Sequence, residues 1–175
     1  GQDIKHLKLD SLHRAIGMVG PDLPLLRGSL RRNINYRRPS ASDDEVLAVC
    51  TLCGLDEFIQ SLPQGLATRL HEQGANLSVG QRQRIALARA LLGEPRLLLL
   101  DEADSNLDPQ FNAAFRRVIE LYRGTVLMVT HEVDWLNIAT EVWHLDGGVL
   151  VERGPPAELL ATNGPTARLF GALQA

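Results

Sequence analysis

The pattern of apolar and polar residues predicts alternating helices and strands along most of the chain. Leu77–Leu92, which reads LSVGQRQRIALARALL, carries apolar residues around most of a helix, with Arg82 and Arg89 on one narrow polar stripe. We therefore expect a helix that is mostly buried. The apolar run Leu97–Leu100 follows it, and this run predicts a strand that is buried on both faces, as in parallel sheets.

The start of the predicted helix has the features of a phosphate-binding site. Ser78 and Gln81 are three residues apart, which is the spacing of a capping box at a helix N-terminus. Gly80 has no side chain, so a ligand can approach the backbone closely there. A helix N-terminus also offers free N–H groups and a partial positive charge to a phosphate. Taken alone, however, these residues are better explained by a capping box that binds no ligand.

Other elements are predicted from the same kinds of signal. Ala15–Val19 predicts a strand, and Ser42 and Glu45 form a second capping-box spacing before a helix expected from Asp43 to about Cys53. The remaining expected elements are a short helix Leu55–Ser61, a helix Pro109–Tyr122, a strand Thr125–Thr130, a short helix Asp134–Ala139, a hairpin of Glu141–Leu145 and Val149–Arg153, and a terminal helix beginning at Ala157–Leu160. Alternating strands and helices with a helical insertion predict an α/β fold with a parallel core.

Charged and polar residues follow the two predicted core strands. Asp101 and Glu102 come directly after the run Leu97–Leu100, and His131 follows the strand Thr125–Thr130. Ligands of parallel sheets bind outside the carboxyl ends of the strands, where these side chains would emerge. A capped helix, a carboxylate pair and a histidine, each at the end of an element, form a specific combination.

These motifs, in this order, closely resemble the nucleotide-binding domain of ABC transporters, and specifically the exporter type. LSVGQ resembles the signature motif, LLLLDE the Walker B strand, SNLD the D-loop, and His131 the switch histidine. The resemblance extends from Gly1 to about Phe170. It implies a P-loop NTPase-like parallel sheet core, incomplete in this sequence, with an inserted all-helical subdomain at 30–93 and a catalytic core portion at 94–175. All of 1–175 would then be the C-terminal portion of one ABC ATPase domain.

The resemblance also implies how ATP is held and who the partners are. In this family two nucleotide-binding domains meet head to tail with two ATP molecules between them, and each signature motif contacts the ATP of the other domain. Ser78, Gly80 and Gln81 would therefore bind the γ-phosphate of a partner's ATP. The second domain would be an identical or a different chain, and a transmembrane domain would be fused upstream or separate. The chain would lie on the cytoplasmic side of a membrane.

Further roles are implied for the residues at the strand ends. Asp101 would hold Mg²⁺ through water, and Glu102 would orient or deprotonate the attacking water. His131 would contact the γ-phosphate and stabilise charge in the transition state. Ser105 and Asp108 would pack across the dimer interface. The implied cofactors are thus ATP and Mg²⁺, and the implied activity is that of an ATPase.

Composition narrows the function classes. The chain has 175 residues, 45% of them hydrophobic, which suits one domain with a sizeable core. Its net charge of −3 argues against a nucleic-acid partner, because nucleic-acid binders carry a basic surface. No apolar run approaches the ~20 residues that span a bilayer. Cys50 and Cys53 form a lone C-x-x-C inside a helical pattern, so we expect buried thiols rather than a zinc or redox site.

The sequence departs from the family pattern in three places. A P-loop needs GxxxxGK[ST], but the only lysines are Lys5 and Lys8, and neither follows a glycine-rich loop. In the family that loop lies upstream of the position of Gly1, so we expect this sequence to be a truncated piece that is inactive by itself. Pro21 stands where the Q-loop has its glutamine, which puts metal binding and coupling through this loop in doubt. Val79 replaces a common second glycine, which is a milder change.

Several interpretations remain open. The first is the ATP-hydrolysing part of an exporter, and the second is a non-hydrolysing, truncated or degenerate module that donates its signature to a partner's ATP. A more distant third is an ABC-type ATPase of DNA repair or chromosome maintenance. The five arginines of Arg27–Arg38 fit a solvated face, a nucleic-acid or anionic-lipid patch, or a docking surface for a membrane domain. His71–Gly74 is either a coupling loop or a simple polar loop before a capped helix.

Overall fold

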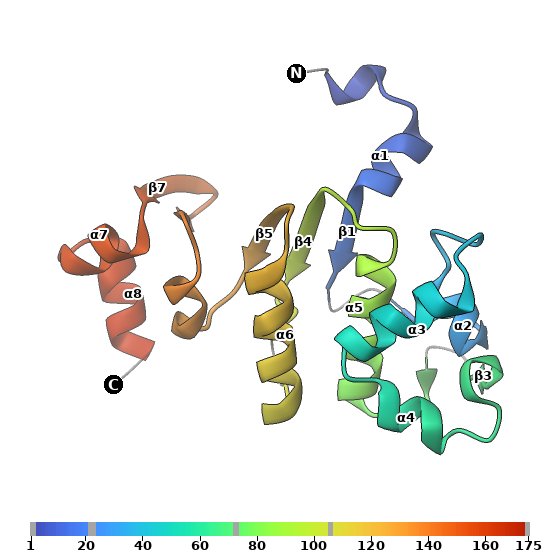
Figure 1. Cartoon of the computed structure of the whole chain (residues 1–175). Helices are drawn as coiled ribbons and strands as arrows, with labels where there is room; N and C mark the ends of the chain where they lie inside the picture. The colour runs from blue at the N-terminus through green and yellow to red at the C-terminus, as the bar shows by residue number, and fades with distance from the viewer. Residues whose placement is uncertain (1–2, 21–23, 72–73, 105–106, 174–175) are drawn as a thin grey trace. The chain divides into compact units, whose positions relative to one another are not determined.

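The computed structural model describes residues 3–20, 24–71, 74–104 and 107–173. Its chain divides into two compact units, Gly1–Thr130 and His131–Ala175, and each unit is described by itself (Figure 1). The first unit contains a parallel sheet with helices, which confirms the predicted α/β class.

The sheet of the first unit has three parallel strands in the order β1-β4-β5. The strands are β1 (Ile16–Val19), β4 (Leu97–Asp101) and β5 (Thr125–Val129). Each lies within one residue of a strand predicted from the apolar pattern. In a parallel sheet all carboxyl ends meet at one edge, so the residues that follow the three strands lie together there.

One face of this sheet is packed against helix α5 (Val79–Leu91). Gly17 of β1 makes this close approach possible, because a Cβ on Gly17 would lie 2.5 Å from the main-chain oxygen of Ala90. Leu98 and Leu100 of β4 point to the same face and are buried. The face therefore forms part of the hydrophobic core of the first unit.

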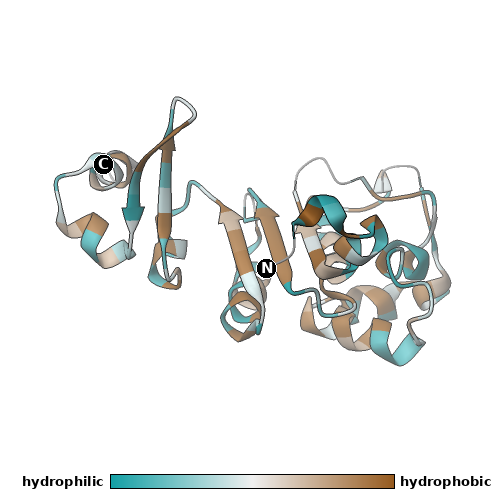
Figure 2. Cartoon of the chain, turned by 90° about the horizontal axis from the view of Figure 1, so that it is seen from above, coloured by the Kyte–Doolittle hydropathy of each residue, from teal (hydrophilic) through white to brown (hydrophobic). Residues whose placement is uncertain are grey.

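The opposite face of the sheet is open in the described part of the chain. Met18, Leu99 and Leu127 are paired in register across the three strands and therefore share this face. Met18 is 43% exposed and Leu127 is 49% exposed, while Leu99 is half-buried. The expectation that Leu97–Leu100 is buried on both faces is therefore not met within the described residues. Figure 2 shows how strongly apolar these strands are along their length.

The predicted insertion is mainly helical, and Figure 1 shows its helices grouped together. Its helices are α2 (Leu30–Ile34), α3 (Asp43–Leu52), α4 (Asp56–Ser61) and α5, with a 3-10 turn, η2 (Gly65–Ala67). Both α3 and α5 begin with the predicted capping boxes, at Ser42 and Ser78. The insertion also contains a short strand that the pattern did not predict, β3 (Arg69–Leu70). It pairs antiparallel with β2 (Gly28–Ser29).

The rest of the first unit consists of η1 (Ile4–His6), α1 (Leu9–Ala15) and α6 (Pro109–Leu121). Helix α1 was not expected, and it takes Ala15, so the strand begins one residue later than predicted. Helix α6 confirms the predicted helix from Pro109. None of the helices in the described part of the chain combines the length and the hydropathy that a membrane span requires.

The second unit contains a hairpin followed by helices. Its elements are η4 (Val133–Asn137), β6 (Val142–Asp146), β7 (Val149–Gly154), α7 (Pro156–Ala161) and α8 (Pro165–Leu173). The hairpin confirms the prediction made from the Asp146-Gly-Gly turn. The single terminal helix that was expected is instead two helices, since Pro165 begins a new one.

Candidate functional site

The carboxyl ends of β1 and β4 bring two predicted site segments together. A Cβ placed on Gly20, the residue after β1, would lie 3.4 Å from Cβ of Asp101 and 4.0 Å from its Oδ2. Gly20 therefore lies directly beside the first carboxylate of the predicted pair. Pro21, which we align with the Q-loop glutamine, lies outside the described residues.

Asp101 and Glu102 differ in backbone conformation although they are adjacent. Asp101 is the last residue of β4, whereas Glu102 has a φ of +47°, in the left-handed region that residues other than glycine rarely adopt. The N–H of Glu102 donates to the carbonyl of Val129 at 3.0 Å, and this bond to β5 holds the unusual turn in place. Both side chains are exposed, so both carboxylates can reach a ligand at the edge of the sheet. Backbone strain of this kind is concentrated at functional sites.

The loop after the carboxylate pair is tied to the end of β5. The hydroxyl of Thr130 donates to Oδ2 of Asp104, a contact that joins residues 26 positions apart in the chain. The loop after β4 and the end of β5 are therefore held together. The position of Glu102 thus depends on two strands rather than on one.

The N-terminus of α5 has the predicted capping box. The hydroxyl of Ser78 accepts from the N–H of Gln81 at 3.1 Å, and the Gln81 side chain accepts from the N–H of Ser78 at 2.9 Å. Ser78 is exposed and the neighbouring Val79 is 53% exposed. A partner molecule can therefore reach this helix end, although both polar side chains already have a structural task.

Asp108 approaches the same helix within the chain. A Cβ on Gly80 would lie 3.2 Å from Oδ2 of Asp108, so a larger residue at position 80 would crowd this carboxylate. Asp108 also accepts the N–H of Phe111 at 2.9 Å and so caps helix α6. The carboxylate thus joins the start of α6 to the start of α5.

Arg84 completes this junction, and the sequence did not single it out. Its Nη2 donates to both carboxylate oxygens of Asp108, at 3.0 and 2.9 Å, and its Nη1 donates to the carbonyl of Gly54 at 2.8 Å. The guanidinium also lies 4.9 Å from the ring centre of Phe111. The available signal was its place one turn after Gly80 in α5, but its partner Asp108 is 24 residues away.

The other end of α5 is fixed against α2 by Arg89. Its Nε donates to the main-chain oxygen of Asn33 at 2.7 Å, and its Nη2 donates to Oδ1 of Asn33 at 2.8 Å. Asn33 is fully buried, so these bonds satisfy polar groups in the core. Burial lowers the pKa of Arg89, and the carbonyls around it compensate for part of its lost hydration. The predicted polar stripe is therefore structural at this end of the helix.

The two remaining predicted site residues, Ser105 and His131, are not placed relative to the residues described above. Ser105 lies outside the described residues, and His131 is the first residue of the second unit. His131 is exposed. Its role as switch histidine is therefore considered below as a proposal.

The site suits a magnesium ion that is shared with phosphates. Mg²⁺ is usually bound by one or two carboxylates together with substrate phosphates and water, and two exposed carboxylates lie at the end of β4. No cluster of three or more His, Cys, Asp or Glu side chains that could hold a metal occurs among the described residues. Cys50 and Cys53 are free and buried, which confirms the expected buried thiols.

Comparisons with known proteins agree with this geometry. The family model described as "ABC transporter" matches residues 1–105. The ATP-dependent lipid A-core flippase of Thiobacillus denitrificans is 40% identical over 172 residues, covering 97% of this chain and 30% of the relative. The cyclolysin secretion/processing ATP-binding protein CyaB of Bordetella pertussis is 42% identical over 177 residues, covering 100% of this chain and 25% of the relative.

A solved structure is similar over the whole chain. It is that of a bacterial Atm1-family ABC exporter with ATP bound, with a TM-score of 0.89 and 35% sequence identity, covering 100% of this chain and 31% of that one. Adjacent carboxylates at the end of a parallel strand, in a chain whose capped helix α5 carries LSVGQ, are the features of a nucleotide-binding α/β domain. The chain belongs to the ABC transporter family, and its relatives are exporter-type ATP-binding proteins. It spans less than a third of the length of each relative named here.

Proposed function

We propose that this chain is the carboxyl-terminal part of an ATPase domain that drives export through a membrane domain. The observation that carries the proposal is the pair Asp101 and Glu102 at the end of β4, with Gly20, the residue after β1, beside Asp101. Similarity to exporter ATP-binding proteins supports the transport role. The protein as a whole would act on the cytoplasmic side of a membrane.

The two carboxylates have separate tasks in this proposal. Asp101 continues the strand and binds Mg²⁺ through water, while Glu102 leaves the strand in its left-handed conformation and orients or deprotonates the attacking water. Bound Mg²⁺ neutralises charge on the β- and γ-phosphates. His131 donates to the γ-phosphate and stabilises the charge that develops there.

The site is completed by a second domain and by an upstream segment. Ser78, Gly80 and Gln81 bind the γ-phosphate of ATP held by the partner domain, and Ser105 and Asp108 lie at the dimer interface. The exposed face around Met18 and Leu127 supports packing by an upstream segment of the same protein, which brings the phosphate-binding loop to the carboxylates. Packing against a neighbour removes the cost of leaving this apolar face in water.

The test is a pair of carboxamide substitutions in the complete protein. Glu102→Gln is expected to lower ATP turnover by about 10²–10⁴, the usual contribution of a general base, while ATP and Mg²⁺ stay bound. Asp101→Asn is expected to weaken Mg-ATP binding as well. Glu120→Gln is the matched control, since Glu120 is an exposed carboxylate on α6, and it should leave turnover unchanged.

Dimer formation gives the second readout. With ATP intact, Glu102→Gln should accumulate as an ATP-stabilised dimer in gel filtration, and this dimer should dissociate with ADP. Parental turnover in Glu102→Gln, or a dimer trapped by Asp101→Asn instead, would show that the two roles are assigned wrongly. If the protein has no turnover but still dimerises with a hydrolysing partner, it is the signature-donating module instead.

A further inference from the structure

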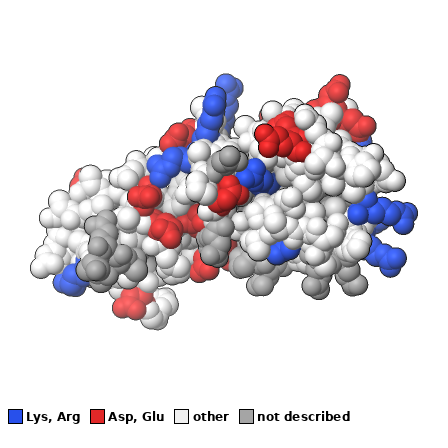
Figure 3. Space-filling view, turned by 90° about the horizontal axis from the view of Figure 1, so that it is seen from below, with Lys and Arg blue, Asp and Glu red and all other residues white. Residues whose placement is uncertain are grey.

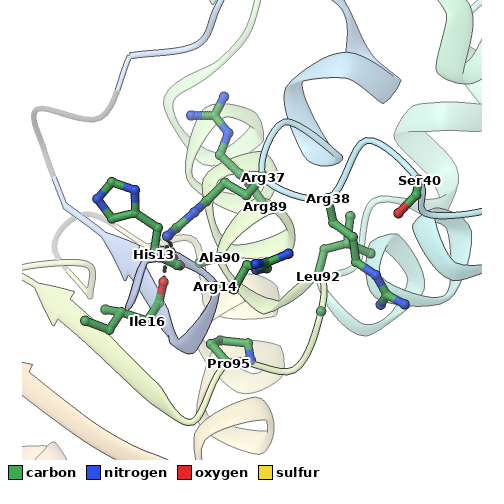
Figure 4. Close-up of a pocket in the computed structure, with 11 residues that line it drawn as sticks. His13, Arg14, Ile16, Arg37, Arg38, Ser40, Arg89, Ala90, Leu92 and Pro95 are labelled. Carbon is green, nitrogen blue, oxygen red and sulfur yellow. Dashed lines mark hydrogen bonds between the residues drawn. The ribbon is translucent and has the colours of Figure 1, made fainter. Parts of the chain in front are cut away.

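A cavity lies at the opposite end of the first unit from the carboxylates. Its volume is about 220 Å³, and three separate segments line it: the end of α1 with the start of β1, residues 37–40, and the end of α5 with the loop that follows (Figure 4). It is thus at the amino end of β1 and the carboxyl end of α5. Because α5 has 13 residues, its two ends are about 20 Å apart. The cavity is therefore separate from the proposed ATP site.

The lining of this cavity is strongly positive. Four arginines contribute to it, namely Arg14, Arg37, Arg38 and Arg89, and none of the residues that line it is an aspartate or a glutamate. Elsewhere basic and acidic side chains are interspersed, as on the face shown in Figure 3, in keeping with the net charge of −3. A recess lined by charges of one sign concentrates ions of the opposite sign.

Two of these arginines are fixed in place without being neutralised. Arg37 donates through Nη1 to the carbonyl of Ile16 at 2.6 Å and through Nη2 to the carbonyl of His13. Arg89 likewise donates to main-chain oxygens and to the Asn33 amide. These acceptors carry no net charge, and arginine stays protonated at all ordinary pH values. Both positive charges therefore remain uncompensated at the cavity.

The other two arginines border the open part of the cavity. Arg38 pairs with Glu45, which lies outside the lining, at 2.9 Å. The guanidinium of Arg14 makes no hydrogen bond and no ion pair with any described residue, and it extends into the middle of the group drawn in Figure 4. Arg14 is exposed, so it can turn to meet a ligand.

We propose that this cavity is a binding site for a small phosphate-bearing anion. Guanidinium groups bind phosphate oxygens through paired, charge-assisted hydrogen bonds, which lysine cannot reproduce. The volume is below the ~300–1,000 Å³ of sites for larger ligands, so a phosphate or pyrophosphate group fits better than a whole nucleotide. The phosphate can come from a soluble compound or from a lipid headgroup.

Titration calorimetry with pyrophosphate on the complete, purified protein tests the proposal. It is done with a saturating non-hydrolysable ATP analogue present, so that the nucleotide site is already filled. We expect saturable binding that Arg14→Gln weakens about tenfold, the effect of one charge-assisted hydrogen bond at a partly exposed position. Arg117→Gln is the control, because Arg117 is an exposed arginine on α6 outside the cavity, and it should bind like the parent.

Three outcomes would overturn the proposal: no binding of pyrophosphate, equal affinity in Arg14→Gln and the parent, or loss of binding when the ATP analogue is added. Flotation with phosphatidylglycerol vesicles separates the two phosphate sources. Arg14-dependent binding to vesicles, together with pyrophosphate competition, assigns the site to a headgroup. Pyrophosphate binding without Arg14-dependent flotation assigns it to a soluble anion.

Discussion

Replacing Asp108 tests how the start of α6 is joined to α5 in the first unit. Its carboxylate caps α6 through the N–H of Phe111 and pairs with Arg84 of α5. These two tasks can be separated by substitution. Asparagine caps a helix about as well as aspartate does, but it has no charge to offer Arg84, whereas alanine removes both contributions.

The expected magnitudes follow from the two contacts. Loss of an N-cap typically costs about 1 kcal/mol. The Arg84 side chain is only 18% exposed and that of Asp108 is 47% exposed, so their ion pair lies near the upper end of the ~0–1 kcal/mol range of surface pairs. We therefore expect Asp108→Ala to lower the free energy of unfolding by about 2 kcal/mol and Asp108→Asn by about 1 kcal/mol.

Urea unfolding followed by circular dichroism measures these differences, and Arg84→Met completes a double-mutant cycle. The methionine keeps most of the packing against Phe111 but carries no charge. In the Arg84→Met background, Asp108→Asn should cost almost nothing. Equal destabilisation by alanine and asparagine would refute the capping role, and a coupling energy near zero would refute the ion pair.

Three further predictions concern other parts of the chain. Gly17→Ala should destabilise the protein by about 1–3 kcal/mol, because its Cβ would meet a main-chain oxygen of α5, whereas Gly171→Ala, with open space around it, should not destabilise; both are measured by urea unfolding. Burial raises the pKa of Cys50 to about 12 and that of Cys53 still further, so the native thiols should resist Ellman's reagent at pH 8. Just above pH 9 only the thiols of the unfolded chain ionise, so the free energy of unfolding should fall as the pH rises from about 9 toward 12. In Cys50→Ala this fall should be less steep. In the complete protein, Pro21→Gln should tighten magnesium binding, measured as the Mg²⁺ concentration that gives half-maximal turnover; an identical Mg²⁺ dependence would show that this loop is misaligned.

The sequence predicted the elements whose signals are local. The strands that become β1, β4 and β5 are continuous apolar runs, and the helices α3 and α5 begin with capping boxes whose partners are three residues apart. Such signals need no knowledge of the tertiary fold. The position of the carboxylate pair Asp101 and Glu102 at the end of β4 could be predicted for the same reason, because the pair directly follows the apolar run.

The features that were missed depend on contacts between distant residues or on very short elements. β2 and β3 have two residues each, which is too short for any periodicity to be visible. They pair only because the 39 residues between them, 30–68, fold so that the two strands meet. The link from Arg84 to Asp108 spans 24 residues and two helices. The left-handed turn at Glu102 is set by its bond to β5, a contact that residue types alone do not specify.

The capping box at Ser78 limits which groups of the signature motif remain for a phosphate. The box uses the N–H groups of Ser78 and Gln81, and it holds the Gln81 side chain back against the helix. The N–H groups of Val79 and Gly80 make no hydrogen bond with any described residue, so these two donors are open at the helix end. Valine in place of glycine at position 79 keeps such a donor. In the proposed dimer, we therefore expect these main-chain N–H groups and the exposed Ser78 hydroxyl to contribute most of the binding to the γ-phosphate. We expect a smaller direct contribution from Gln81, whose side chain also stabilises the helix end.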